Sequence, residues 1–477
     1  MKDSNVKKNT IYNAIKSAAA IVFPLISFPY ASRVLLTEGI GKVNFGNSVI
    51  SYFTLIATLG ISTYAMRECA KVRDDKAKLS ATASQMFSIN MVTTVLSYIL
   101  LALTLLFAKP LEEYRLLIVV QSTAILFTTL GADWLNTAME DFKYLTLRTV
   151  AFQALSLVAM FLFVRKPEDY LIYALISVVS AAGSNFLNIF YRRRYCSVRF
   201  TFNMDLRKHL GPILLLFSMI LSQTIYVNSD VTIIGLYRGD HEVGLYSTAV
   251  KIYTIVNTMV ASVAFVVMPK LTYWFSKKDY GEINSLLRYG LGFIVTLGLP
   301  CIVGVNTVCR DVVEFLAGPE YLDAAPALHI LTIALLGSFL GGFVGNLIMI
   351  PSGREKVCLL TSLISAALNL VLNMIFIPIF GFVAAAATTA TAELTGFFIA
   401  LHFVEKQVNV GNLRKLLLPP IIGCAAMAAT VLLMSTVIDT LLLRLIISVA
   451  LGAILYLAVL ILMKHEFTLD LLKKANK

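Results

Sequence analysis

The sequence predicts an all-α polytopic membrane protein with about 14 transmembrane helices, arranged as two six-helix lobes and two further C-terminal helices. Three observations lead to this fold class. Of the 477 residues, 58% are hydrophobic and 14% are charged, apolar stretches of membrane-spanning length recur along the whole chain, and only short charged or turn-rich breaks separate them. Soluble domains contain about 45–50% apolar and about 25% charged residues, so the composition excludes a water-soluble fold.

Each predicted helix is an apolar stretch near the roughly 20 residues that cross a bilayer core of about 30 Å. The first set lies near residues 9–33, 40–66, 80–107, 114–138, 144–164 and 169–191. The second set lies near residues 210–237, 242–268, 284–305, 323–350, 357–378, 380–404, 416–436 and 441–463. Lys7 and Lys8 precede the first stretch as they would in a signal peptide, but the apolar run continues to Tyr30, so we expect a retained helix.

Two parts of the chain resemble one another weakly. The run Glu38–Phe45, which opens the second predicted helix, resembles Glu242–Tyr246, which opens the eighth. The loops that follow each carry an aspartate with an apolar residue four positions later: Asp75 with Leu79, and Asp279 with Ile283. This pattern predicts a parallel repeat of two lobes related by an axis along the membrane normal. Chance similarity and shared packing of small residues are the alternatives.

The repeat divides the chain into four predicted parts. Residues 1–195 form the N-terminal lobe and residues 196–209 form a basic connecting loop on the cytoplasmic side. Residues 210–405 form the second lobe, and residues 406–477 hold the two additional helices with a cytoplasmic tail. A central cavity between two such lobes is the expected substrate path.

The basic residues are distributed unevenly between the two sides of the predicted membrane. Two of the 40 fall inside helices, Lys16 and Lys251, and nine lie on one side: Arg33, Lys42, Lys109, Arg115, Arg165, Lys166, Arg238, Arg310 and Arg444. The other 29 lie on the opposite side, which the positive-inside rule identifies as cytoplasmic, so both termini are predicted to be cytoplasmic. The net charge of +12 then faces lipid headgroups, and a nucleic-acid partner is not expected.

No enzyme signature is visible in the sequence. Zinc-protease, nucleophile-elbow and phosphate-loop motifs are absent, and the five histidines are scattered. The six cysteines show no C-x-x-C pair and fall mostly in or beside predicted helices, so we expect small buried apolar residues. The sequence therefore predicts neither catalysis nor a metal or other cofactor.

Lys251 is the strongest candidate for substrate binding. It lies about ten residues into the eighth predicted helix, or roughly 15 Å at 1.5 Å per residue, close to the bilayer midplane. Ionisable residues at that depth cost several kcal/mol and usually face a cavity. Its ammonium could hold a phosphate or pyrophosphate oxygen. The alternative is a structural ion pair with a buried carboxylate such as Glu393.

Other charged residues have more evenly balanced interpretations. Lys16 lies about two turns into the first helix, where it either faces the cavity or extends back to the surface. Arg33 and Asp230 lie near the outer ends of the first and seventh helices, as a charged rim or gate or as interfacial anchors. Asp133 and Trp134 at the end of the fourth helix, with Glu140 beyond it, are expected to be structural.

Two prolines interrupt the first predicted helix. Pro24 and Pro29 each remove a backbone hydrogen bond and are expected to bend the helix. A bent first helix acting as a hinge could open a lateral portal for a lipid. A static kink is the alternative.

Several runs resemble a known family. Phe23–Phe45 is similar to the first two helices of the bacterial polysaccharide-biosynthesis flippases of the Wzx type, which export O-antigen or capsule repeat units. Asp133-Trp134 with Glu140, Tyr144 and Arg148 resembles the fourth-to-fifth helix segment of that family. Asp230–Gly235, Val243–Ser247 and Lys251 resemble its seventh and eighth helices. The sequence departs at Leu36, where the family pattern usually has glycine.

The resemblance implies a flippase of the multidrug/oligosaccharidyl-lipid/polysaccharide exporter superfamily in the bacterial inner membrane. Its substrate would be an undecaprenyl-pyrophosphate-linked oligosaccharide, moved from the cytoplasmic to the outer leaflet by alternating access in polysaccharide or lipopolysaccharide synthesis. Lys251, Lys16 and Arg33 would attract the pyrophosphate. Membrane lipids and the polysaccharide polymerase machinery are the further partners that the resemblance suggests.

Three other functions stay open at this stage. A peptidoglycan-precursor flippase would share a basic cavity, whereas a cation-coupled drug exporter of the same superfamily should carry acidic residues deep in the membrane. A membrane-embedded glycosyltransferase or ligase would need a nucleotide-sugar site or a large exterior loop. The longest predicted loops, of about 20 residues, leave no room for one.

Overall fold

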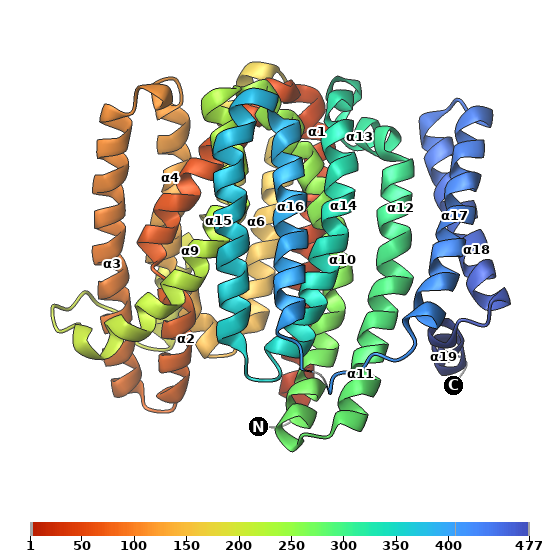
Figure 1. The fold of residues 1–477 in the computed structure, drawn as a ribbon. Coiled ribbons are helices and arrows are strands. Elements are labelled where there is room, and N and C mark those ends of the chain that lie inside the picture. The colour runs from red at the N-terminus through yellow and green to blue at the C-terminus, as the bar shows by residue number, and fades with distance from the viewer. Residues whose placement is uncertain (1–2, 406, 476–477) are drawn as a thin grey trace. The chain divides into compact units, whose positions relative to one another are not determined.

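The computed structural model describes residues 3–405 and 407–475, and within these ranges the regular secondary structure is helical (Figure 1). The charge count above includes Lys2, Lys406 and Lys477, which lie outside the described residues. The chain forms two compact units, Met1–Gly244 and Leu245–Lys477. The predicted all-α membrane fold is thus confirmed, while the predicted lobe boundaries stay a prediction.

The first unit is built from long helices joined by short turns. Its helices are α1 (Asp3–Thr58), α2 (Ile61–Lys71), α3 (Lys76–Phe107), α4 (Arg115–Gly131), α5 (Asp133–Ala138), α6 (Phe142–Phe163), α7 (Tyr170–Val178), α8 (Asn185–Tyr191) and α9 (Leu206–Tyr237). A π-helical segment, Val179–Gly183, joins α7 to α8. Helix α9, which the repeat counts as the first helix of the second lobe, packs on α1 and α2.

Helix α1 combines the first two predicted spans. Its backbone is helical except at Leu36, where φ is 61° and ψ is −176°. The prolines expected to bend it, Pro24 and Pro29, lie seven or more residues earlier, inside helical backbone. The carbonyl oxygen of Pro29 accepts from the Arg33 guanidinium at 2.7 Å and from the Ser32 hydroxyl at 3.3 Å. The main irregularity of this helix is therefore at Leu36.

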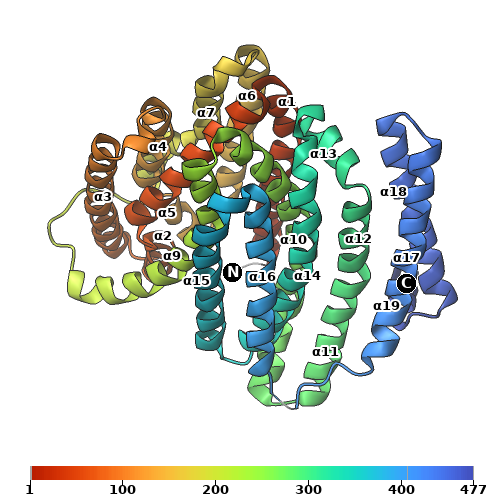
Figure 2. The same ribbon diagram turned by 45° about the horizontal axis from the view of Figure 1, so that its top comes forward.

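The second unit begins within α10 (Asp240–Lys277), which bends by 47° between Ser262 and Val267. Its other helices are α11 (Tyr280–Phe293), α12 (Leu299–Thr307), α13 (Cys309–Ala317), α14 (Ala325–Gly342), α15 (Glu355–Phe380), α16 (Phe382–His402), α17 (Leu413–Val437), α18 (Leu441–Leu462) and α19 (Glu466–Ala475). Figure 2 shows α15 beside α16 and α17 beside α18, and these pairs pack closely. An ion pair between Arg444 and Asp311, at 2.6 Å, fastens α18 to α13.

Eleven helices of the described residues are long and apolar enough to cross a membrane, or twelve with the bent α10 counted as one span. The predicted number of 14 is not confirmed. One reason is that the first two predicted spans are continuous as Ile11–Lys71, and another is that Arg115–Gly131 has only 17 residues. The remaining predicted spans each coincide with a helix.

Two helices that the predicted repeat matches begin in the same way. The Asp75 carboxylate caps α3 by accepting from the backbone N–H groups of Ala77 and Lys78, and the Asp279 carboxylate caps α11 in the same way. Such caps satisfy amide groups that a helix start leaves without partners. The apolar residues four positions later, Leu79 and Ile283, are both fully buried. The sequence match therefore reflects equivalent local structure.

The cysteines agree with the prediction of small buried residues. Cys69, Cys196, Cys309 and Cys424 are buried, Cys301 and Cys358 are partly buried, and all six are free thiols.

Candidate functional site

The polar residues of α10 form a stripe along one face of the helix in the second unit. Lys251, Thr254, Thr258 and Ser262 recur every three or four residues, which places them on one face of the helix. Thr254, Thr258 and Ser262 are exposed, and Lys251 is half-buried. Each hydroxyl donates to a carbonyl oxygen of its own helix at 2.7–2.8 Å, so its oxygen keeps lone pairs for another partner. We call these four residues the α10 stripe.

Lys251 lies in the middle of the first straight part of α10. That part runs from Asp240 to Ser262, so Lys251 is 11 residues, or roughly 17 Å, from either end. The mid-membrane depth expected from the sequence stays a prediction. Because a charge at that depth is costly in lipid, the face that carries Lys251 is expected to meet a polar cavity or substrate.

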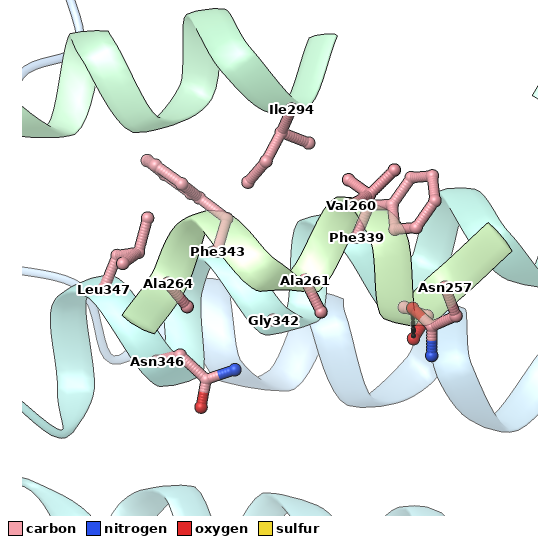
Figure 3. Close-up of a pocket in the computed structure, with 11 residues that line it drawn as sticks. Asn257, Val260, Ala261, Ala264, Ile294, Phe339, Gly342, Phe343, Asn346 and Leu347 are labelled. Atoms are coloured by element: carbon pink, nitrogen blue, oxygen red, sulfur yellow. Dashed lines mark hydrogen bonds between the residues drawn. The ribbon is translucent and has the colours of Figure 1, made fainter. Parts of the chain in front are cut away.

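Next to the stripe, α10 contributes to a small pocket of about 30 Å³ between α10, α14 and the helical segments Ile294–Gly298 and Phe343–Met349 (Figure 3). Val260, Phe339 and Phe343 supply apolar walls, and Asn257 and Asn346 supply amides. The Ser338 hydroxyl donates to the Asn257 amide oxygen at 3.3 Å, drawn as a dashed line. The pocket holds at most a water-sized group, so it can admit one end of a polar ligand but not a sugar chain.

Glu393, the carboxylate that the sequence suggested as a partner for Lys251, lies on α16 near the same region of α10. It accepts a hydrogen bond from the Tyr253 hydroxyl at 3.5 Å. Gly337 on α14 packs directly against the Glu393 backbone, because a Cβ atom there would lie 2.9 Å from the Glu393 carbonyl carbon. Glu393 therefore contacts both α10 and α14. Its partner on α10, Tyr253, is two residues from Lys251.

The repeat places a different residue at the position of Lys251 in the first unit. The offset from Asp75 to Asp279 is 204 residues, but Gly41 and Gly244 are 203 residues apart. The offset of 203 matches Ser48 with Lys251 and Ser51 with Thr254. Ser48 is buried, donates to the Phe45 carbonyl oxygen at 2.7 Å and accepts from the Thr232 hydroxyl at 3.0 Å. Of the hydroxyl residues of the stripe, Thr254 is matched by Ser51, whereas Thr258 and Ser262 are matched by Leu55 and Leu59, so the stripe belongs to the second unit.

Asp230, a predicted gate residue, is 5% exposed and lies on α9. It acts electrostatically on the Tyr52 hydroxyl of α1, which is 3.1 Å from the Thr232 hydroxyl. Asp230 is therefore set in a polar contact between α1 and α9.

Lys16 and Arg33, the other two predicted phosphate-binding residues, both lie on α1. Lys16 is partly buried and Arg33 is exposed. Seventeen residues separate them, or roughly 26 Å along a helix. A single pyrophosphate cannot contact both at once, so the two residues could act only at different depths of a transport path.

A close backbone contact joins α1 to the first turn of α10, within the first unit. A methyl group added at Gly41 would overlap the Asp240 carbonyl group, and one added at Gly244 would overlap the Thr37 carbonyl group. Gly41 and Gly244 are repeat-equivalent at 203 residues, and so are Thr37 and Asp240. The two matched segments therefore pack against each other reciprocally. The Thr37 hydroxyl also lies 2.8 Å from Nδ1 of His241.

The sequence did not reveal how the family motif at the end of α4 is used. Arg148, with a side chain 2% exposed, forms an ion pair with Asp133 at 2.6 Å and donates to the Asn185 amide oxygen at 3.0 Å. Asn188 donates to Asp133 at 3.3 Å and accepts from Asn136 at 2.9 Å. The cluster ties α5, α6 and α8 together, which supports the structural interpretation of Asp133. In the sequence, the feature that could have indicated this cluster is Arg148, a charged residue near the start of a predicted span.

Charged residues in the neighbouring turns form a second set of contacts. Glu140 pairs with Arg73 at 2.6 Å, and the hydrogen bond between them raises the pKa of Arg73. Burial acts to raise the pKa of Asp141, but hydrogen bonds from the Tyr195 and Tyr191 hydroxyls outweigh it and hold that pKa below its usual range. These contacts stabilise one end of the first unit.

The described residues contain no group of three or more His, Cys, Asp or Glu side chains that could hold a metal ion.

The chain matches the family described as "Polysaccharide biosynthesis protein" over residues 6–275, more than half of its length. It belongs to this family. The sequence is 26% identical over 181 residues to the "Probable low-salt glycan biosynthesis flippase Agl15" of Haloferax volcanii, a match that covers 38% of each chain. It is 22% identical over 412 residues to the "Putative O-antigen transporter" of Escherichia coli (strain K12), covering 84% of this chain and 97% of the relative.

The fold of this polysaccharide biosynthesis protein is similar to a solved structure titled "Lipid II flippase MurJ, inward closed conformation". The TM-score is 0.75 at 15% identity, covering 97% of this chain and all of that one. At that identity the similarity concerns the fold. The family resemblance expected from the sequence is confirmed.

Proposed function

We propose that this protein is a flippase that moves an undecaprenyl-pyrophosphate-linked oligosaccharide from the cytoplasmic to the outer leaflet by alternating access. The product would feed the synthesis of a surface polysaccharide such as O-antigen or capsule. The family membership and the names of the relatives support this proposal. The observation that carries it is the placement of Lys251 midway along α10, on the same face as three exposed hydroxyls.

The α10 stripe offers two kinds of binding group in one row. The Lys251 ammonium can donate to a pyrophosphate oxygen as a point charge. Thr254, Thr258 and Ser262 satisfy their own hydrogens within the helix and leave oxygen acceptors for sugar hydroxyls. The stripe from Lys251 to Ser262 is roughly 17 Å long, enough for a phosphate and several sugar rings.

The membrane potential acts in the direction that this proposal needs. A potential negative inside favours outward movement of anions by about 2.3 kcal/mol per charge per 100 mV. A pyrophosphate with two charges would gain about 4.6 kcal/mol per 100 mV.

The alternatives differ in what they require at membrane depth. A peptidoglycan-precursor flippase would use the same cationic stripe and differ only in its sugar. A drug exporter that attracts cations would need an acidic residue in place of Lys251. The proposal assigns transport to this protein and no catalytic activity. It also places the protein in the bacterial inner membrane with both termini in the cytoplasm, where it would work with the polysaccharide polymerase machinery.

Complementation of a bacterial strain that lacks its own repeat-unit flippase tests the proposal. Expression of this chain, in a strain that makes the matching sugar repeat, should restore surface polymer and remove accumulated lipid-linked repeat units. Parallel assays should show no rescue after depletion of the lipid II flippase and no export of a cationic dye. Rescue of lipid II depletion, or dye export with no polymer, would contradict the assignment.

A further inference from the structure

The segment that joins α8 to α9 is held in an extended conformation by a row of serines on α3. Three serines four residues apart each accept a hydrogen bond from a backbone N–H of this segment. The pairs are Ser197 to Ser80 at 3.3 Å, Arg199 to Ser84 at 3.1 Å and Thr201 to Ser88 at 2.8 Å. Four helical residues rise about 6.0 Å and two extended residues about 6.6 Å, so the two spacings match.

The side chains of the segment become more exposed along the chain. Cys196 is buried and Val198 packs against the core of the first unit. Farther along, Phe200 is 47% exposed and Phe202 is 91% exposed, and their rings meet edge to face with centroids 5.2 Å apart. Two exposed aromatic rings held on a fixed backbone need an apolar environment to cover them.

The exposed apolar surface continues onto the first turns of α9. Leu206, Leu210 and Leu214 recur every four residues, lie on one face of the helix and are 40–49% exposed. Figure 1 shows that the start of α9 lies across the direction of α3, at the edge of the first unit. A span ends at Arg194 and the next begins at Leu206, so the intervening residues stay close to the surface of the bilayer.

The same region is strongly basic. Between Arg192 and Lys208 there are six basic residues and one acidic residue, Asp205. Five of the basic residues are exposed: Arg193, Arg194, Arg199, Arg207 and Lys208. A polar groove of about 490 Å³ beside the segment is lined by Ser80, Ser84, Gln85, Arg199, Thr201 and Asn203 among others, with no carboxylate in its lining.

We propose that residues 199–214 form an anionic-lipid anchor at the membrane surface. Phe200, Phe202 and the three leucines enter the boundary between acyl chains and headgroups, and Arg199, Arg207 and Lys208 bind headgroup phosphates. Aromatic residues beside clustered basic residues are the combination that suits an anionic interface. A soluble phosphate compound would use the basic residues but would leave the rings uncovered. The anchor thus fixes the connection between α8 and α9 to the bilayer and to α3 together.

Tryptophan fluorescence in vesicles tests this anchor. Full-length protein carrying Phe202→Trp is reconstituted into vesicles that contain either brominated phosphatidylglycerol or brominated phosphatidylcholine at equal mole fraction. The emission of Trp134 and Trp274 is subtracted by using the unsubstituted protein. We expect the added tryptophan to be quenched at least about twofold more by the anionic lipid. Phe380→Trp is the matched control, since Phe380 is 64% exposed at the end of α15 with no Lys or Arg within 20 residues along the chain.

Neutralising the basic residues should separate the two parts of the anchor. In the Phe202→Trp background, Arg199→Gln with Arg207→Gln and Lys208→Gln should leave quenching in place but abolish the preference for phosphatidylglycerol. Phe200→Trp provides a second reporter if Phe202→Trp fails to insert. Absence of quenching by either lipid, as expected if water or a protein partner covers the rings, would overturn the proposal. Equal quenching by both lipids would also overturn it, because it would show apolar contact without recognition of anionic headgroups.

Discussion

Gly41→Ala should destabilise the protein, because the contact between α1 and the start of α10 leaves no room for a side chain. A Cβ atom on Gly41 would lie 2.6 Å from the Asp240 carbonyl carbon, about 1 Å short of the 3.5–4.0 Å at which carbon atoms attract. The Asp240 carbonyl oxygen would lie closer still, so the two segments must separate by more than about 1 Å. Overpacking of this kind costs about 1–3 kcal/mol.

Two further terms set the net effect. Separation also weakens the hydrogen bond between Thr37 and His241, now 2.8 Å long, which is worth about 0.5–1.5 kcal/mol. Alanine in a helix regains about 1 kcal/mol relative to glycine. The expected net loss is about 1–3 kcal/mol. With an unfolding entropy of about 2.1 cal/mol/K per residue over 477 residues, this is a fall in Tm of about 1–3 °C.

The assay is thermal unfolding of purified protein, with Gly341→Ala as the control. The nearest atom to a Cβ on Gly341 is 3.9 Å away, so that variant should keep or slightly raise the Tm. Gly244→Ala should behave like Gly41→Ala, because the two positions meet reciprocally. If one separation makes room for both methyl groups, the double variant should lose less than the sum of the single losses. A Gly41→Ala protein as stable as the control, or strictly additive losses, would refute the reciprocal contact.

Other consequences of the structure can be tested separately. Lys251→Ala should lower polymer export at equal membrane insertion, whereas Lys270→Ala, an exposed lysine farther along α10, should not. If Lys251 were instead a structural partner of Glu393, Lys251→Ala would lower the Tm and Glu393→Gln would recover it in the double variant. Leu36→Gly should raise the free energy of unfolding by about 1 kcal/mol. A non-glycine residue with the positive φ of Leu36 costs about 1–3 kcal/mol, and the Leu36 side chain is already 39% exposed. A lower Tm would show that the Leu36 backbone is not strained. The folded-state pKa of Asp141 is lowered, so its contribution to stability is present above the unfolded pKa near 4 and is lost as pH falls further. Asp141→Asn should therefore make the Tm less dependent on pH in this acidic range.

The sequence predicts the membrane fold because hydropathy acts locally. A bilayer imposes one length and one composition on every span, so the predicted stretches find the helices with little tertiary information. The repeat is also visible locally, since Asp75 and Asp279 cap helices through amides only two and three residues away. The number of spans is harder to predict. The boundary between the first two predicted spans is a kink at the single residue Leu36, where the family pattern has glycine, and not a loop.

Contacts between distant residues could not be predicted from the sequence. Arg148 meets Asp133 and Asn185, at separations of 15 and 37 residues, only because α5, α6 and α8 converge. The serines of α3 are more than 100 residues from the segment that they hold, and their four-residue spacing alone is equally typical of a surface-exposed helix face. The roles of such polar residues depend on which backbone lies opposite them, which periodicity does not encode.

Lys251 illustrates how the repeat and the departures from it divide structure from function. Where the two halves agree, as at Gly41 with Gly244 and Asp75 with Asp279, both members serve packing or capping, which any pair of similar lobes needs. Where they differ, a buried Ser48 that hydrogen-bonds within its own unit is matched by the half-buried Lys251, midway along the first straight part of α10. A charged side chain within a membrane span costs several kcal/mol, and such residues commonly mark substrate paths. An anionic substrate whose phosphate meets Lys251 would account for the charge on α10.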